Sequence, residues 1–276
     1  MLIKFTKMHG LGNDFVVIDG VRQHINLTTK AIKKLADRHL GIGCDQLLLI
    51  EPPSDKKIDF NYRIFNSDGS EVEQCGNGAR CMGRYIADQQ LSGKKTVLLQ
   101  TKNRVMEVTT KAKNLVTANM GAPIFTPSEI PFICQQQDIK YSIESKSQTF
   151  DIAALSVGNP HAIIQVEDVN TAAVEEIGPL IQTNSQFPES VNVGFMQIVD
   201  RQTIKLRVYE RGVGETQACG SGACAAAVAA IQQDLVDSRV NLVLLGGELS
   251  VEWCGEGQPI LMTGPAETVF HGKIKI

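Results

Sequence analysis

The sequence predicts an α+β fold of two pseudo-symmetric α/β domains that arose by internal duplication. The main observation is a repeat: "RIFNSDGSEVEQCGNGA" begins at Arg63, and "RVYERGVGETQACGSGA" begins at Arg207, 144 positions later. Upstream, "LGNDFVVID" from Leu11 is similar to "VGNPHAIIQ" from Val157, at an offset of 146. Chance likeness between two glycine-rich loops is the alternative, but two motifs repeated in the same order favour two halves of similar fold.

The expected secondary structure supports this division. Segments with alternating or β-branched residues predict strands in both halves. They are residues 15–19, 46–50, 60–66, 96–101, 104–110 and 115–120, then 161–166, 191–199, 203–210, 240–253 and 259–264. Helices are expected at residues 29–38, 78–89, 172–183 and 222–233. Because the strands follow one another closely, we expect a mainly antiparallel sheet or barrel wrapped around a central helix in each half.

Two features set the expected domain boundaries. The segment 121–132 contains three prolines and is interpreted as a linker between the halves. The final segment, "AETVFHGKIKI", is strand-like and is expected to return to the first domain. The prediction is therefore one domain of residues 1–118 plus 264–276 and a second of residues 119–263, with the functional site in the cleft between them.

Composition narrows the classes of function. Of the 276 residues, 43% are hydrophobic and 21% are charged, which is typical of a soluble globular protein. With 27 basic and 30 acidic residues, the net charge of -3 argues against nucleic acid or an anionic membrane as a partner. No apolar run suits a signal peptide or a membrane span. The 7 cysteines form no dense framework and no C-x-x-C, so we expect reduced thiols, a cytoplasmic location and no structural metal site.

The repeated motif places Cys-Gly-x-Gly just before a helix-forming run. The x position holds Asn77 or Ser221, both preferred N-cap residues, so each cysteine is expected at or just before a helix N-terminus. Free backbone N–H groups and the helix dipole at such a position are expected to lower the thiol pKa and to hold a carboxylate. Gly76 and Gly220 would let a ligand approach the backbone closely.

Duplication of this loop favours a pair of cysteines over a single nucleophile. A protease-like cysteine needs a histidine base, and His161 alone does not account for two such loops. If both helix N-termini hold one carboxylate, Cys75 and Cys219 flank the neighbouring carbon. One thiolate then removes a proton while the opposite thiol delivers one, which inverts the configuration without a cofactor. Donors at the helix ends would stabilise the carbanion.

A family resemblance points to the same chemistry. "NSDGSEVEQCGNGAR", from Asn66 to Arg80, matches completely the signature of diaminopimelate epimerases, and "GLGNDF", "GNPH" and "ERGVGETQACGSGA" also resemble that family. The resemblance covers essentially the whole chain. It implies an isomerase that interconverts LL- and meso-diaminopimelate, a small-molecule substrate, without pyridoxal phosphate, on the route to lysine and peptidoglycan precursors. It also suggests a homodimer.

The same resemblance supplies the candidate site. Cys75 and Cys219 would be catalytic, and His161 and Glu210 would tune their pKa values. The implied substrate-binding residues are polar side chains and loop glycines: Asn13, Gln46, Asn66, Gly76, Asn77, Asn159, Asn192, Glu210, Arg211, Gly220 and Ser221. Any single asparagine is as readily a turn residue, but the repeated Gly-Asn favours Asn13 and Asn159.

The two halves differ at one position of the repeat. Glu210 aligns with Asn66, and this difference would help one thiol and one thiolate to coexist. Arg211 suits a carboxylate through bidentate pairing. Glu71 and Glu215 are also repeated, and for them we expect only a structural role that holds the loop.

Two other classes of protein stay open. A proline racemase-like enzyme would also use two cysteines, but its second loop typically reads Asp-Arg-Ser-Pro-Cys-Gly-Thr-Gly, whereas this chain has "ETQACGSG". A small cyclic substrate would not need Arg211 either. A thiol-based redox or metal-binding protein would need a working disulfide or a bound metal, which metal analysis and thiol counting before and after reduction would reveal.

Overall fold

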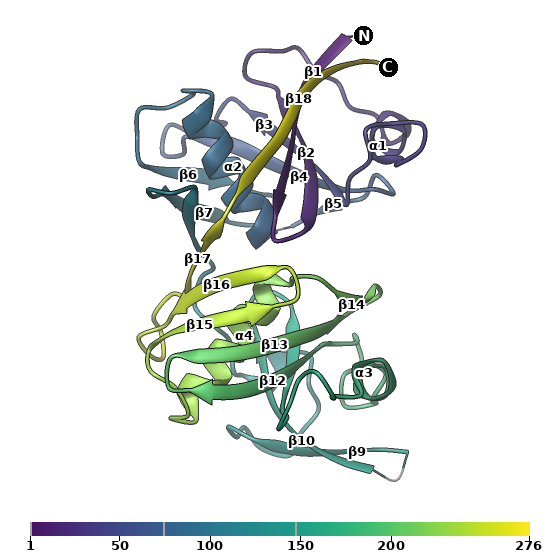
Figure 1. The fold of residues 1–276 in the computed structure, drawn as a ribbon, viewed down its shortest axis with the longest axis vertical. Coiled ribbons are helices and arrows are strands. Elements are labelled where there is room, and N and C mark those ends of the chain that lie inside the picture. The colour runs from purple at the N-terminus through teal and green to yellow at the C-terminus, as the bar shows by residue number, and fades with distance from the viewer. Residues whose placement is uncertain (1, 74, 147) are drawn as a thin grey trace. The chain divides into compact units, whose positions relative to one another are not determined.

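The computed structural model describes residues 2–73, 75–146 and 148–276, and the chain divides into two compact units (Figure 1). Unit 1 runs up to Asn119 and resumes at Thr263, and unit 2 is Met120–Met262. The C-terminal strand β18 (Glu267–Lys275) pairs antiparallel with β1 (Leu2–Gly10), so the end of the chain lies in unit 1.

Unit 1 is a mixed sheet in which most neighbours are antiparallel. After β1, its elements are β2 (Asn13–Asp19), α1 (Thr29–Ala36), β3 (Gln46–Glu51), β4 (Phe60–Asn66), β5 (Glu71–Val72), α2 (Gly76–Asp88), β6 (Thr96–Gln100), β7 (Val105–Thr110) and β8 (Leu115–Asn119). β2 pairs parallel with β3, and β4 pairs parallel with β6. Helices α1 and α2 lie between the strands of these pairs, because a parallel neighbour requires a crossover connection.

Unit 2 repeats this order. Its elements are η1 (Pro127–Glu129), β9 (Tyr141–Ser145), β10 (Gln148–Ser156), β11 (Pro160–Gln165), α3 (Val174–Gln182), β12 (Asn192–Asp200), β13 (Thr203–Glu210), β14 (Gly214–Thr216), α4 (Gly220–Gln232), β15 (Arg239–Leu244), β16 (Gly247–Glu252) and β17 (Leu261–Pro265), which leads back to unit 1. The parallel pairs are again β11 with β12 and β13 with β15. β10 to β16 therefore reproduce the pairing of β1 to β7.

One helix of each unit is enclosed by its sheet. α2 packs against β1, β2, β3, β7 and β8, and α4 packs against β10 to β13, β15 and β16. Every residue of α4 from Gly222 to Ala230 is buried, and most are alanine or glycine. A helix that is apolar all round suits such a central position, so the expected sheet around a central helix is confirmed. No helix in the described ranges has the length and apolarity needed to cross a membrane.

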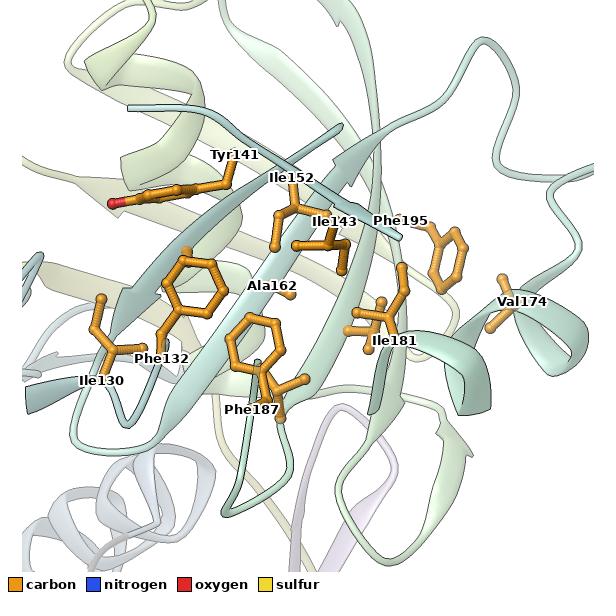
Figure 2. Close-up of a cluster of buried hydrophobic side chains, with 13 residues drawn as sticks. Ile130, Phe132, Tyr141, Ile143, Ile152, Ala162, Val174, Ile181, Phe187 and Phe195 are labelled. Carbon is orange, nitrogen blue, oxygen red and sulfur yellow. The ribbon is translucent and has the colours of Figure 1, made fainter. Parts of the chain in front are cut away.

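The other face of each sheet carries the second helix. In unit 1, Ile32 and Leu35 of α1 pack with Val16, Leu47 and Leu49 of the sheet. In unit 2, α3 contributes Val174 and Ile181 to the corresponding cluster, which Figure 2 shows together with Phe132, Phe187 and Phe195.

The proline-rich segment 121–132 is not a linker, which corrects the sequence-based interpretation. Ile124 forms a β-bridge with Ser156, and Ile130 and Phe132 are buried in the unit 2 cluster (Figure 2). The rings of Phe132 and Phe187 stack with their centroids 4.6 Å apart. The apolar side chains between the prolines decided where this segment packs.

Strands β1, β9 and β10 and the short strands β5 and β14 were not predicted. β1 reads "LIKFTKMHG", in which lysines and a histidine interrupt the apolar positions. It is nevertheless paired on both edges, with β18 and β2. Tertiary pairing therefore outweighed the weak local pattern.

Candidate active site

Cys75 caps helix α2. Its backbone is extended (φ -148°, ψ 112°), the helix begins at Gly76, and the Gly78 N–H donates to Cys75 Sγ over 3.3 Å. The cysteine itself, rather than Asn77, is therefore the N-cap residue, which corrects the sequence-based expectation. The Cys75 sulfur therefore lies at the N-terminal end of helix α2, where a backbone N–H donor stabilises a negative charge.

Cys219 repeats this geometry at the start of α4. Its backbone is extended (φ -112°, ψ 108°), the helix begins at Gly220, and the Gly222 N–H donates to Cys219 Sγ over 3.3 Å. Ser221 Oγ lies 3.5 Å from the same sulfur. Ser221, like Asn77, is thus the second helical residue rather than the cap.

The fourth position of each Cys-Gly-x-Gly motif is a glycine at which a side chain would meet neighbouring atoms closely. A Cβ atom on Gly78 would lie 2.4 Å from the Tyr62 hydroxyl, and one on Gly222 would lie 3.1 Å from a Val208 methyl group. Each glycine lets its cap approach the strand behind it, β4 or β13. Val208 and Tyr62 are buried, so the cap positions are set by the core.

Burial makes Cys219 harder to ionise, which contradicts the expected fall in its thiol pKa. The residue is 5% exposed, and burial raises its pKa well above the usual range. The Glu210 carboxylate adds to this rise, both by its charge and by accepting a hydrogen bond from the thiol. The Gly222 N–H and Ser221 act in the opposite direction but do not prevail.

Glu210 is held beside Cys219 by its own contacts. It ends strand β13, and the Thr216 hydroxyl donates to its Oε1 over 2.5 Å. The Gln182 side chain of α3 donates to its backbone carbonyl over 3.1 Å. The carboxylate therefore has a fixed place next to the thiol.

Cys75 faces an amide instead of a carboxylate. Its Sγ lies 3.9 Å from Asn13 Oδ1, and Asn77 Nδ2 lies 3.4 Å from the same oxygen. Asn13 follows the turn of Leu11 and Gly12, both at positive φ, and begins β2. Three of the predicted residues, Asn13, Cys75 and Asn77, are thereby brought together.

Gln46 and Asn66 form a second polar pair in unit 1. They are register partners at one end of β3 and β4, and Gln46 Nε2 donates to Asn66 Oδ1 over 3.0 Å. Asn66 Nδ2 in turn donates to the Ser70 hydroxyl over 3.2 Å. Gln46 Oε1 is buried and accepts no hydrogen bond from the described residues.

His161 and Asn159 lie together in unit 2. His161 is fully buried, and its Nε2 lies 3.0 Å from Asn159 Oδ1. Burial, assisted by the charge of Arg211, lowers the pKa of His161 to about 3, so the ring is neutral. An amide oxygen only accepts, so Nε2 carries the proton in this contact.

Asn192 and Arg211 are linked through the backbone. Asn192 is buried, donates to the Pro160 carbonyl over 2.9 Å and accepts from the Arg211 N–H over 3.0 Å. The Arg211 guanidinium donates to the Glu189 carbonyl over 3.0 Å and is otherwise exposed. An exposed guanidinium with remaining donors suits a carboxylate.

The repeated glutamates hold their loops, as expected. Arg63 binds both carboxylate oxygens of Glu71 at 2.8 and 2.9 Å. Arg207 binds those of Glu215 at 2.6 and 2.8 Å. Each pair joins the long strand to the short strand that leads into a capping cysteine.

Three residues near the site were missed from the sequence. Asp45 binds Asn13, Thr216 binds Glu210, and Tyr62 lies against the Cys75 loop. Tyr62 occupies an alternating strand position that is typical of core residues, so no signal marked it. Asp45 directly precedes Gln46, and this adjacency was the one available hint.

Solved structures share this fold. A phenazine biosynthesis protein of the PhzF family from Bacillus anthracis matches with a TM-score of 0.70 at 15% identity, covering 100% of both chains. A probable proline racemase from Agrobacterium radiobacter K84 matches with a TM-score of 0.72 at 15% identity, covering 99% of this chain and 93% of the other. At this level of identity these likenesses show a shared fold.

Sequence comparison identifies the family. The diaminopimelate epimerase family matches residues 5–126 and 153–269. The diaminopimelate epimerase of Ectopseudomonas mendocina (strain ymp) is 54% identical over 276 residues, which is 100% of both chains. The chain belongs to the diaminopimelate epimerase family, and its likeness to proline racemase extends only to the fold.

Proposed function

We propose that this protein is a cofactor-independent amino-acid epimerase that converts LL-diaminopimelate to meso-diaminopimelate, for the biosynthesis of lysine and peptidoglycan precursors. Family membership and one feature of the structure support this function. That feature is the duplicated cysteine cap, in which one thiol faces an amide and the other faces a carboxylate. A symmetric pair would not distinguish an acid from a base, whereas two thiols in these different surroundings would.

The reaction is a proton exchange at one carbon. One cysteine, as thiolate, takes the α proton and becomes a thiol, and the electron pair of the C–H bond stays on the carbon. The other cysteine, as thiol, gives its proton to the opposite face and becomes a thiolate. Configuration inverts, and the two cysteines exchange protonation states. Burial and, after it, the charge of Glu210 favour the thiol form of Cys219 in the free protein.

The two helix N-termini would hold the carboxylate beside the reacting carbon. Gly76 and Asn77 are the first residues of α2, and Gly220 and Ser221 are the first residues of α4. N–H groups at the start of a helix point outward along its axis, and these would stabilise the charge that moves onto the carboxylate as the carbanion forms.

The remaining predicted residues would recognise the rest of the substrate. Diaminopimelate carries an amino and a carboxyl group at each end, so it needs polar contacts away from the reacting carbon. Arg211 would pair with the distant carboxylate. The other proposed contacts are amide or carboxylate side chains: Asn13, Gln46, Asn66, Asn159, Asn192 and Glu210.

His161 and Glu210 would tune the thiols. The neutral ring of His161 adds no charge near Asn159, so burial and the carboxylate of Glu210 would set the protonation of Cys219.

A homodimer and a cytoplasmic location complete the proposal, with units 1 and 2 as the two epimerase halves. The paired strands β1 and β18 carry exposed Leu2, Val269 and Phe270, which would suit burial against a second copy. The 7 cysteines of the sequence form no dense framework and no C-x-x-C, which is the basis for proposing a reducing compartment. Light scattering of the purified protein tests the dimer.

The proposed function is tested by incubating the purified protein with LL-diaminopimelate in deuterated water, without added cofactor. The meso form should appear and carry deuterium at the inverted carbon, while remaining substrate is unlabelled early in the reaction. Equal early labelling of substrate and product would point to a single base and contradict the two-base scheme.

The cysteine pair is tested separately by alanine substitution. Cys75→Ala and Cys219→Ala should each lower kcat by at least about 10³-fold, because each removes one of the two proton-transfer groups. The matched control is Cys254→Ala, which changes an exposed thiol and should keep wild-type turnover. Near-normal turnover in the Cys219 variant would refute the pairing.

A further inference from the structure

The orientation of the Asn13 amide is fixed by one acidic side chain. Asn13 Nδ2 donates to Asp45 Oδ2 over 2.9 Å. A carboxylate oxygen only accepts, so the amide must turn its NH₂ group toward Asp45. The amide oxygen is thereby left facing Cys75 Sγ at 3.9 Å and Asn77 Nδ2 at 3.4 Å.

Asp45 is itself held on both oxygens. The Asp14 N–H donates to Asp45 Oδ2 over 3.1 Å, and the Arg38 guanidinium donates to Oδ1 over 2.8 Å. The Asp45 N–H returns a hydrogen bond to Asp14 Oδ1 over 2.9 Å. The carboxylate therefore cannot turn away from Asn13 without losing several charge-assisted bonds.

Asp14 anchors this group to the sheet. Arg38 binds both of its carboxylate oxygens, and Lys7 of β1 binds one of them at 2.5 Å. Lys7 also donates to the Gly43 carbonyl. Burial acts to raise the pKa of Asp14, but the hydrogen bonds from Arg38 and Lys7 hold that pKa well below its usual range, so the anchor stays ionised.

We propose that Asp45 is a positioning residue for Cys75: it holds the Asn13 amide so that its oxygen, and not its NH₂ group, faces the sulfur. An oxygen in that place accepts from the thiol and opposes the thiolate, whereas an NH₂ group would do the reverse. Asp45 thus acts on the protonation of Cys75 through Asn13. The role in turnover rests on the proposed function, but the effect on the thiol does not.

Unit 2 holds the equivalent asparagine differently. Asn159 Oδ1 accepts a hydrogen bond from His161 Nε2 over 3.0 Å. The repeated Gly-Asn is therefore oriented by an acid in unit 1 and by a neutral ring in unit 2, so a change at Asp45 should affect only one of the two thiols.

The test measures the alkylation of each cysteine by iodoacetamide against pH, with peptide mapping of the intact chain. In Asp45→Ala, the Asn13 amide is free to turn, and its NH₂ group stabilises the thiolate. The midpoint of Cys75 alkylation should fall by about one pH unit, which makes the reaction about tenfold faster below the midpoint. The midpoint for Cys219 should not change.

The titrations of two neighbouring groups do not obscure this readout. Among the described residues, Tyr62 of β4 and Cys81 of α2 are titratable groups coupled to Cys75 through their charges. Burial raises the pKa of Tyr62 well above its usual range and raises that of Cys81 to about 12. Both stay neutral across the pH range of the experiment.

Two further variants distinguish a loss of Asn13 amide orientation from a general loosening of the loop that contains Asp45. Asp45→Asn keeps an oxygen that can accept from Asn13 and should restore the wild-type midpoint. Asp59→Ala is the matched control, because Asp59, like Asp45, accepts hydrogen bonds from a backbone N–H and from a cationic side chain. These donors are the Leu98 N–H and the Lys94 ammonium group. The Asp59→Ala variant should leave both midpoints unchanged, and thermal melting of all variants monitors the fold.

A double-mutant cycle with Asn13→Ala shows whether Asp45 acts through the amide. In the Asn13→Ala background, Asp45→Ala should give no further shift of the Cys75 midpoint. A shift that persists there, or an unchanged midpoint in the single Asp45→Ala variant, would overturn the proposal. Alkylation needs no substrate, so a protein that shifted as expected but failed to epimerise diaminopimelate would refute the proposed function and leave this inference intact.

Discussion

The surroundings of the two cysteines differ although their caps are the same. Both sulfurs accept a backbone N–H over 3.3 Å at the start of a helix of the same length. Yet Cys75 faces the amide oxygen of Asn13, whereas Cys219 is buried and hydrogen-bonded to the Glu210 carboxylate. Duplication has preserved the backbone geometry, and the side chains around it have diverged. The difference shows that a helix terminus alone does not fix a thiol pKa.

The comparison also shows which physical effect prevails. A helix N-terminus stabilises a nearby negative charge by up to about 2 kcal/mol. Removing a thiolate from water into a buried site next to a carboxylate costs more than that. For Cys219 the second effect is larger, and the pKa rises.

Among changes that leave both cysteines in place, the largest expected effect comes from removing the charge beside Cys219. Glu210→Gln should lower the pKa of Cys219, because burial remains but the carboxylate no longer opposes the thiolate. Cys219 alkylation should then become faster at neutral pH, and kcat/KM should fall by about 10 to 100-fold. The alkaline limb of the activity profile should move to lower pH, because Cys219 now loses its proton sooner.

Thermodynamics supplies an internal check on this variant. The equilibrium constant between the LL and meso forms is fixed, so kcat/KM must fall by the same factor in both directions. Glu248→Gln changes an exposed glutamate of β16 and is the matched control. If Glu210→Gln left both the Cys219 alkylation profile and the activity profile unchanged, Glu210 would not be the source of the asymmetry.

Much of this architecture was predictable because duplication leaves a signal in the sequence. The Cys-Gly-x-Gly repeat located both helices, and the constant offset aligned Glu210 with Asn66. Residue types could not show that the cysteine is the cap, because Asn77 and Ser221 are the statistically favoured cap residues. The cap is determined by the backbone conformation, which places each cysteine sulfur within hydrogen-bond distance of the N–H of the third helical residue.

The remaining misses have tertiary causes. The fate of segment 121–132 depended on a cluster formed by distant residues such as Phe187. The pKa of Cys219 depended on burial, which the repeat does not encode. Asp45 acquired its role because β2 and β3 pair in parallel and place it beside Asn13.

A second prediction compares the space behind the two caps. Gly78→Ala should destabilise the protein by about 2–3 kcal/mol, because its Cβ would meet the buried Tyr62 hydroxyl at 2.4 Å. Gly222→Ala should cost less than about 1 kcal/mol, because a Val208 methyl group at 3.1 Å has only to shift slightly and alanine favours the helix. Urea denaturation of the two variants measures the difference.

The double variant Tyr62→Phe/Gly78→Ala locates the clash. The Tyr62 hydroxyl is buried and has no hydrogen-bond partner among the described residues, so its removal should cost little alone and should relieve Gly78→Ala. Equal costs for the two glycine substitutions, or no rescue, would mean that the strands behind the caps do not differ as proposed.

The smallest expected effects concern the two Arg–Glu pairs that hold the loops. The Arg63 and Glu71 side chains are 43% and 29% exposed, and those of Arg207 and Glu215 are 20% and 16% exposed. Glu71→Gln should therefore cost about 0.5 kcal/mol, because solvent screens an exposed pair. Glu215→Gln should cost about 1–2 kcal/mol, because Arg207 keeps its contacts to the Val169 and Ala172 carbonyls and would be left with a poorly compensated charge.

Hydrogen exchange of the peptides that contain each loop measures the local opening free energy, since a change in one loop need not alter global unfolding. A larger loss of protection in the Glu71 variant than in the Glu215 variant would show that burial does not rank the two pairs.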